Sequence, residues 1–233
     1  MPTFVHGKGT GVLLDQYNLS EYFNSADVAQ TIDVAETTSF TASSKSYIVG
    51  LQDATLSLSG LYSQDAGGSD AVLSGILGTA TTPLVTVAFD TGTIGNRCVT
   101  GRVHETNYSI SNPVADVSSV TADFNASTDA VSNQTYGLHG GVMLTTGASI
   151  AFGSLGDLAS VDNGASSSSG AMAVLHVTAN NIAGGTTTIK VQHSTDDVTF
   201  ADLITFTAVG ASSLTKQLSP VTGTVNRYVR ATA

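Results

Sequence analysis

The chain has 233 residues, of which 41% are hydrophobic and only 11% are charged, and its formal net charge is −10. This negative balance argues against a free-standing nucleic-acid-binding protein, because such proteins need a basic surface for the phosphates. The low charge and the many valine, isoleucine and leucine residues argue against a disordered chain, and the length suits one large β domain or two small ones.

The acidic side chains are concentrated in the first part of the chain. Residues 1–132 carry 13 acidic and four basic side chains, a balance of −9, whereas residues 133–233 carry five and four, a balance of −1. The strand pattern also pauses at residues 131–136. We therefore predict two domains, residues 1–132 and 133–233, that meet different surroundings.

Cysteine usage and the N-terminus indicate the compartment. Cys98 is the only cysteine, so there is no disulfide framework and no thiolate metal cluster. The N-terminus lacks the apolar core of a signal peptide, and no apolar run approaches the roughly 18 residues of a membrane span. We expect synthesis and folding in a reducing cytoplasm, where the four Asn-x-Ser/Thr sequons have no glycosylation meaning.

Residues 1–35 match neither the helical nor the strand period. They are polar with scattered apolar residues, and we predict a long arm or loop with at most one helical turn. An arm of this length is often functional. Its apolar anchors are Val12, Leu13, Leu14, Tyr17, Leu19, Tyr22 and Phe23.

Strand signals begin at Lys45. Between residues 53 and 63, apolar side chains at positions 54, 56 and 58 alternate with hydroxyl side chains, which predicts a strand with one buried face. The hydroxyl positions are Thr55, Ser57 and Ser59.

One helix is predicted over residues 69–78. Ser69 is its candidate N-cap and Gly78 its candidate C-cap, and an apolar stripe lies between them. Strands follow at residues 83–90, 97–110 and 114–127, so the first domain is a sheet that carries one short helix.

The second half has short strands at intervals of about 10–15 residues, which is typical of a small β-sandwich. Residues 161–170, with four consecutive serines, form a loop between strands. The predicted strands cover residues 148–153, 171–179, 187–194, 199–209 and 224–231.

No catalytic residue, metal ligand or cofactor site is predicted. None of the five histidines has the spacing of a metal pair. Residues 193–196 contain the residue types of a catalytic triad, but consecutive residues at the end of a strand are typical of a hairpin turn. The aspartates at 196, 197 and 202 lack the alternating ladder and glycine of a calcium loop.

Two further patterns favour structural roles. The glycines of residues 7–11 lack the spacing and the strand–helix context of a phosphate loop. The aromatic residues fall mostly at apolar strand positions, which is typical of core packing rather than of a sugar- or base-stacking platform.

Strands such as residues 114–127 carry few charges and would recruit other strands if left at a sheet edge. Closing identical subunits into a ring gives such edges defined partners. A mobile N-terminal arm that orders on assembly is a natural tether to a neighbour. We therefore predict a non-enzymatic structural protein that assembles with copies of itself.

Several stretches together resemble the tail tube (major tail) proteins of bacteriophages with long, non-contractile tails. The resemblance lies in spacing and style and spans most of the chain. The stretches are residues 4–25, 36–63, 70–90, 105–127, 190–206 and 225–231.

The resemblance implies an all-β chain with one short helix, in which a tail-tube-type β-sandwich/barrel domain with an N-terminal arm is followed by a small Ig-like decoration domain. Six subunits would form a ring, and rings would stack into a hollow virion tail tube through which DNA leaves without specific binding. The implied partners are further copies, with tape-measure, tail terminator and baseplate-type proteins, and no membrane. An arm that bridges adjacent rings makes Leu13, Leu14, Tyr17, Tyr22 and Phe23 candidates for inter-ring contacts.

The charge distribution agrees with a DNA conduit, because an acidic or neutral wall does not hold phosphates. On alternation, Thr55, Ser57 and Ser59 are candidates for the hydrated lumen wall. Arg97 and Arg102 do not suit an acidic wall, and we expect them to pair with acids across subunits.

Other functions remain open at this stage. A virion protein that binds a host surface or a saccharide would have a cluster of exposed aromatic side chains on one face of residues 133–233. A capsid decoration protein is a third possibility. An enzyme would need isolated histidine, aspartate and serine residues to converge.

Overall fold

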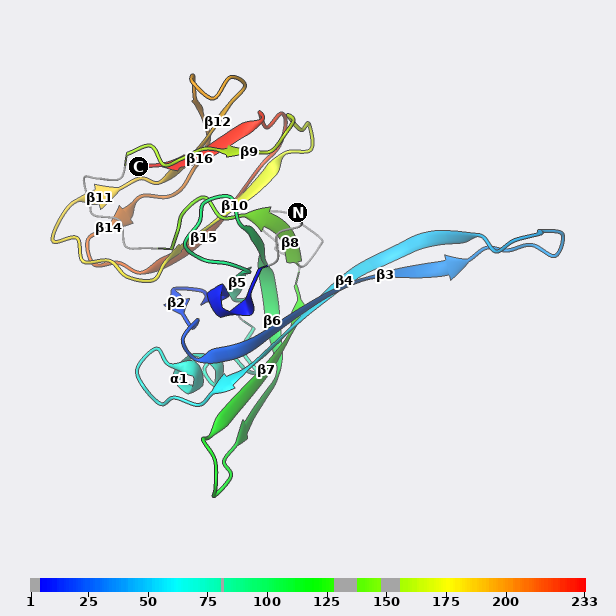
Figure 1. Ribbon diagram of the computed structural model, residues 1–233, viewed down its shortest axis with the longest axis horizontal. Coiled ribbons are helices and arrows are strands. Elements are labelled where there is room, and N and C mark those ends of the chain that lie inside the picture. Colours follow the sequence, from blue (N-terminus) through cyan, green and yellow to red (C-terminus); the bar gives the residue numbers. More distant parts are fainter. Residues whose placement is uncertain (1–4, 81, 128–137, 148–155) are drawn as a thin grey trace. The chain divides into compact units, whose positions relative to one another are not determined.

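A computed structural model describes residues 5–80, 82–127, 138–147 and 156–233 (Figure 1). The described residues are mostly β, with one α-helix, α1 (Ser69–Leu73), and one short 3-10 turn, η1 (Gly7–Gly9). This confirms the predicted fold class of an all-β chain with one short helix. Within the described ranges, no helix has the length and apolar character needed to cross a membrane.

The chain packs as two compact units, each made from separate stretches of sequence. Unit 1 consists of Met1–Glu21, Leu84–Thr100 and Gly140–Ala233, and unit 2 consists of Tyr22–Pro83 and Gly101–His139. These units differ from the two ranges predicted from the sequence. The predicted boundary at 132/133 falls outside the described residues, and that division stays a prediction.

Unit 2 is built on an antiparallel sheet with the strand order β3-β4-β7-β6. In β4 and β7, alternate side chains are buried, and α1 packs against β7. Fully burying a large apolar side chain contributes roughly 1.5–3 kcal/mol. Buried members of this core include Leu56, Leu58, Val72, Leu73, Val120, Ala122 and Phe124. The strands are β3 (Phe23–Glu36), β4 (Tyr47–Leu61), β6 (Arg97–Ser111, of which unit 2 holds the part from Gly101) and β7 (Ser119–Ala126).

The helix is shorter than predicted. It ends at Leu73, and turns continue to Gly78, which has a positive φ of 73°. Ser69 is the first helical residue rather than the N-cap, which is Gly68. The Ser69 hydroxyl donates to the carbonyl of Leu61 (2.8 Å) and accepts from the amide of Ser63 (2.9 Å), so it ties the start of the helix to the end of β4.

Unit 1 contains the small β-sandwich predicted for the second half. The sheet β13-β12-β16-β9 and the pair β10-β15 enclose Val191, Ile204 and Phe206, with Ala173 and Leu175 of β10 packed on them. The predicted strand at residues 148–153 lies outside the described residues. The strands are β8 (Leu138–Val142, shared with unit 2), β9 (Val161–Asp162), β10 (Ala171–Val177), β11 (Thr186–Thr187), β12 (Lys190–Ser194), β13 (Ala201–Thr205), β14 (Val209–Gly210), β15 (Thr215–Val221) and β16 (Tyr228–Thr232).

The prediction of an irregular arm over residues 1–35 is wrong for most of its described part. Residues Gly11–Leu14 form β1, which pairs with β5 (Leu84–Ala88) and with β2 (Tyr17–Asn18), and β3 begins at Phe23. β1 and β2 are too short to give a readable period, and β5, the partner strand of β1, lies far along the sequence. β3 is long, but its side chains are mostly exposed, so its sequence shows no buried face. β1 and β2 therefore belong to the folded core of unit 1.

Candidate functional site

The side of the unit 2 sheet opposite the apolar core is polar. On β4, Leu56 and Leu58 are at most 1% exposed, whereas the hydroxyl side chains that alternate with them are exposed or half-buried. The predicted alternation is therefore present. It places Thr55, Ser57 and Ser59 together on the side of the sheet opposite the apolar core, and their role as a lumen wall stays a prediction.

The strand register aligns further polar residues with these three. Side chains directly opposite each other on antiparallel strands share a face. One row runs Asp27, Ser57, Asp123 and Asn107 across β3, β4, β7 and β6, and the next runs Ser25, Ser59, Thr121 and Ser109. We call this surface the polar face; it consists of Ser25, Asp27, Thr55, Ser57, Ser59, Asn107, Ser109, Thr121, Asp123 and Asn125.

Asp123 is at the centre of the polar face. The Ser57 hydroxyl donates to its Oδ1 (2.6 Å), and the Asn107 amide donates to its Oδ2 (2.8 Å). These two hydrogen bonds, that from Ser57 first, lower the pKa of Asp123 below its usual value, although burial acts in the opposite direction. The polar face therefore has a fixed negative charge at its centre, and Asp27 adds a second carboxylate.

The charge of unit 2 agrees with this surface. Its two sequence ranges contain ten acidic and two basic side chains, a balance of −8. One of the basic residues is Arg102, which lies on β6 before the polar-face residues of that strand and donates from Nη1 to the carbonyl of Thr82 (3.0 Å). The expected pairing of Arg97 and Arg102 with acids of other subunits stays a prediction.

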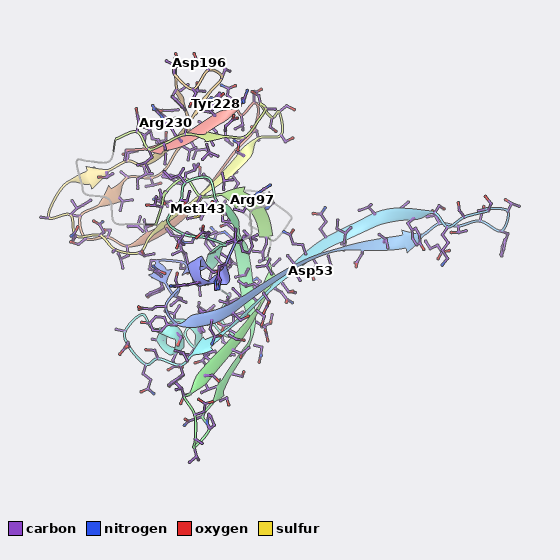
Figure 2. The ribbon with its side chains drawn as sticks, in the orientation of Figure 1. Asp53, Arg97, Met143, Asp196, Tyr228 and Arg230 are labelled. Carbon is purple, nitrogen blue, oxygen red and sulfur yellow. The ribbon has the colours of Figure 1, made fainter. Side chains whose placement is uncertain are left out.

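A second feature of unit 2 is the outer half of the β3–β4 hairpin, which the sequence analysis did not identify (Figure 1). β7 pairs with β4 only from Thr55 to Leu61, whereas β3 and β4 pair with each other out to Glu36 and Tyr47. We call residues 31–53 the outer hairpin; Asp53, at its inner end, is labelled in Figure 2.

The outer hairpin exposes large apolar side chains on two strands that, among the described residues, have no third strand beside them. A two-stranded hairpin is marginally stable in water, and clustered exposed apolar side chains mark interaction surfaces. The residues and their exposed fractions are Ile32 (52%), Val34 (61%), Ile48 (58%), Val49 (71%) and Leu51 (80%). The apolar run Tyr47–Leu51 is the sequence feature that marks the outer hairpin, but the sequence does not show whether such side chains are buried or exposed.

The five candidates for inter-ring contacts fall in different places. In unit 1, Leu14 is completely buried, so it is a core residue with no surface to offer a neighbour, while Leu13 and Tyr17 are half-buried. Tyr22 and Phe23 are half-buried at the start of β3 in unit 2. The predicted role of the four accessible residues stays a prediction.

The residues that resembled a catalytic triad form a hairpin turn, as the sequence predicted. The Ser194 hydroxyl donates to Asp196 Oδ1 (2.8 Å), which also accepts the amides of Val198 and Thr199. These bonds, with the amide of Thr199 first, lower the pKa of Asp196 to about 2. Within the described part of the chain, no three histidine, cysteine, aspartate or glutamate side chains gather as metal ligands would.

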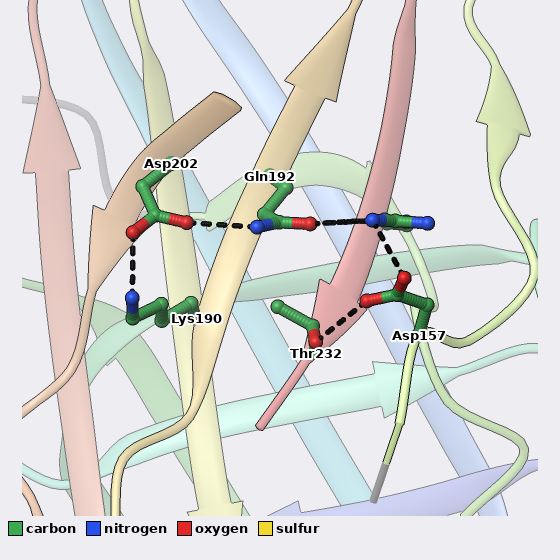
Figure 3. A network of polar contacts seen from close by, with 6 residues as sticks. Asp157, Lys190, Gln192, Asp202 and Thr232 are labelled. Carbon is green, nitrogen blue, oxygen red and sulfur yellow. Dashed lines mark hydrogen bonds and ion pairs between the residues drawn. The ribbon is translucent and has the colours of Figure 1, made fainter. Parts of the chain in front are cut away.

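The sandwich of unit 1 carries a polar network on its four-stranded sheet (Figure 3). Gln192 donates to Asp202 (2.8 Å) and accepts from Arg230 (2.8 Å), which also forms an ion pair with Asp157 (2.9 Å). The Arg230 guanidinium stacks 3.8 Å from the centre of the Phe200 ring. Phe200, the aromatic side chain of this network, is half-buried against Arg230 and is not an exposed ring of the kind expected on a saccharide-binding face.

No protein-family model and no curated protein matches the chain. Among solved structures, it is similar to a chain from the virion of a native gene transfer agent particle, with a TM-score of 0.45 and 15% identity over 53% of this chain and 95% of that one. A chain from the tail of an empty gene transfer agent particle, refined with C6 symmetry, gives a TM-score of 0.43 and 14% identity over the same shares. The Dit protein (gp 19.1) of phage SPP1, described as a hub adsorption protein, gives 0.35 and 12% identity over 95% of this chain and 94% of that one.

These three neighbours come from phage or gene transfer agent particles. TM-scores below 0.5 carry no functional inference, and we base the proposed function on the residues of this chain.

Proposed function

We propose that this chain is a non-enzymatic structural subunit of a phage-type tail tube. Copies of it assemble into rings, six to a ring by the resemblance, and the rings stack into a tube through which DNA passes. The observation that carries the proposal is the outer hairpin, whose exposed apolar side chains have no partner strand beyond β3 and β4 within the part of the chain that the structure describes.

A neighbouring copy is the partner that fits the outer hairpin. The free edge of β3 presents backbone amides and carbonyls, and an exposed apolar edge strand aggregates unless something covers it. In a closed ring every hairpin meets the same surface of the next copy, so each edge is covered once and growth around the ring stops.

The polar face supplies the wall of the tube in this proposal. Asp27 and Asp123 repel DNA phosphates weakly, and the hydroxyl and amide side chains around them keep the wall hydrated. Lysine or arginine at these positions would instead bind phosphates and release counterions, which would hold the DNA in place. Leu13, Tyr17, Tyr22 and Phe23 remain candidates for contacts with the adjacent ring.

The first test changes one side chain of the outer hairpin. In negative-stain microscopy and sedimentation, the wild-type chain should form rings or tubes, and Val49→Asp should remain monomeric because it places a charge on the surface to be buried. Val198→Asp is the matched control, because Val198 is an equally exposed valine outside the outer hairpin. A wild-type chain that stays monomeric at high concentration, or a Val49→Asp chain that assembles like wild type, would contradict the proposal.

A further inference from the structure

A partly buried polar cluster in unit 1 surrounds His176 of β10; Asp15 and Thr86 are buried, and His176 and Thr100 are half-buried. The imidazole Nδ1 lies 2.6 Å from the carbonyl oxygen of Asp15, in the turn between β1 and β2, and Nε2 lies 2.8 Å from the hydroxyl of Thr86 on β5. The Thr86 hydroxyl lies 2.7 Å from that of Thr100, which lies 2.8 Å from the carbonyl oxygen of Val85. These contacts form one chain with a carbonyl oxygen at each end.

The number of protons available to this series of four hydrogen-bond contacts depends on the charge of the His176 ring. Both terminal carbonyls only accept hydrogen bonds, and each threonine hydroxyl has one proton to donate. A neutral imidazole brings one proton, which makes three protons for four contacts, and one contact lacks its hydrogen. An imidazolium brings two, and all four contacts become hydrogen bonds that run outward from the ring to Asp15 and to Val85.

In the neutral state, the proton must be on Nδ1, because a lone pair there would face the carbonyl of Asp15. Nε2 then accepts from Thr86. Thr100 has one proton for two acceptors, the Thr86 oxygen and the Val85 carbonyl. Protonation of Nε2 reverses the direction of the Thr86 hydroxyl and frees Thr100 to donate to Val85.

The charged groups that face His176 are Asp15 and Lys216, which form an ion pair with each other. The Asp15 carboxylate also accepts the amide of Leu84 (2.7 Å), and Lys216 comes from β15, the partner strand of β10. Burial, helped by the charge of Lys216, lowers the pKa of His176, while the carbonyl and carboxylate of Asp15 oppose this shift. His176, Thr86 and Thr100 line a cavity of about 330 Å³, and the thiol of Cys98 lines it too. Burial raises the pKa of the Cys98 thiol, which keeps it protonated.

We propose that His176 is a proton-operated switch within unit 1. Uptake of a second proton by its ring completes the hydrogen-bond chain from Asp15 to Val85, and it makes the existing hydrogen bond from Nδ1 to the β1–β2 turn charge-assisted. The hydroxyl of Thr100, which does not touch the imidazole, therefore sets how readily His176 takes up its second proton.

Replacing Thr100 tests this directly. In Thr100→Val, the hydrogen-bond chain ends at Thr86. When His176 is neutral, the two remaining contacts, to the Asp15 carbonyl and to the Thr86 hydroxyl, each have a proton. When His176 is protonated, its Nε2 donates to Thr86, and the Thr86 hydroxyl then has no acceptor for its own proton. The pKa of His176 should therefore fall by about half to one unit, the equivalent of one hydrogen bond. Thr100→Ser keeps the hydroxyl and should titrate like wild type.

The measurement is NMR of the full-length chain labelled with ¹⁵N-histidine, in solution or as an assembled solid, with His176→Gln to assign the resonance. Wild type should show a protonated Nδ1 and an unprotonated Nε2 at neutral pH, and both protonated in acid. A Thr100→Val chain that titrates at or above wild type would overturn the proposal. If that variant fails to fold, a neutral wild-type ring with its proton on Nε2 would overturn it equally.

Discussion

Glu105 and Asp123 are carboxylates on opposite faces of the unit 2 sheet, and their surroundings move their pKa values in opposite directions. Asp123 receives hydrogen bonds from Ser57 and Asn107 on the polar face, which hold its pKa low. Glu105 is paired with the buried Phe124, and its two carboxylate oxygens are buried without a hydrogen-bond partner within the described residues. Burial raises the pKa of Glu105 to about 8.

Glu105 should therefore make stability depend on pH. The folded chain holds a proton that the unfolded chain releases near its ordinary pKa of 4.5. Stability contributed by this group is thus lost as pH rises from about 4.5 to about 8 and stays low above that range. Glu105→Gln does not titrate, so its stability relative to wild type should increase across the same interval.

Urea unfolding at pH 5 and at pH 8.5 measures this difference. Asp53→Asn, a similar change at an exposed carboxylate, serves as the control and should show a smaller pH-dependent difference. A Glu105→Gln chain whose stability relative to wild type is equal at the two pH values would show that Glu105 is ionised in the folded state or reaches solvent.

At the residue scale, the alternation of apolar and polar side chains along one strand was predictable from the sequence. The residues that lie opposite one another on paired strands were not. The two faces of β4 follow from the period of its own sequence, so Thr55, Ser57 and Ser59 were placed together correctly. Asp123 was not identified, because its position opposite Ser57 depends on the register between β4 and β7. The contacts of His176 arise in the same way, from strands distant in sequence.

At the scale of elements, the inner half of the β3–β4 hairpin contributes to folding, and its outer half contributes to the proposed assembly. Its inner half carries the core residues Leu56 and Leu58, whereas the outer hairpin contributes no buried side chain. Replacing residues 33–51 by Asn-Gly would join the paired residues Ile32 and Gln52 through a two-residue turn. The shortened chain should keep its thermal unfolding temperature within a few degrees and should not form tubes.

Circular dichroism melts and electron microscopy of the shortened chain provide the two readouts. Val198→Asp again provides a folded, assembling reference. Normal tubes from the shortened chain would remove the outer hairpin from the proposed interface. Loss of the folded state would mean that unit 2 needs the outer hairpin for its stability.

Elements with a strong local pattern were predicted, and those that depend on distant partners were missed. The strands at 83–90, 97–110 and 114–127 correspond to β5, β6 and β7, and glycine, asparagine or proline residues bound each of them in the sequence. β15 was missed because its sequence is half polar and contains Pro220, which is unusual within a strand. β1 and β2 were missed because neither exceeds four residues.

At the scale of the molecule, unit 1 unites the two ends of the chain. β1 and β5 come from the first half, and Asp15 and Thr86 bind His176 and Lys216 of the second half. The predicted boundary near residue 132 rests on a change in net charge along the sequence. The two compact units instead reflect which strands pair, and pairing joins segments that are far apart in the sequence. The two divisions make different predictions for the isolated second half.

If unit 1 needs its N-terminal strands, residues 133–233 expressed alone should fold poorly. The fragment lacks Asp15 and Thr86, so His176 and Lys216 lose their partners, and each lost hydrogen bond costs roughly 0.5–1.5 kcal/mol. Its NMR spectrum should be poorly dispersed, while the full-length chain melts cooperatively. Adding residues 1–21 and 84–100 through flexible linkers should restore dispersion. A fragment that folds cooperatively by itself would instead support an independent decoration domain and the boundary predicted at residue 132.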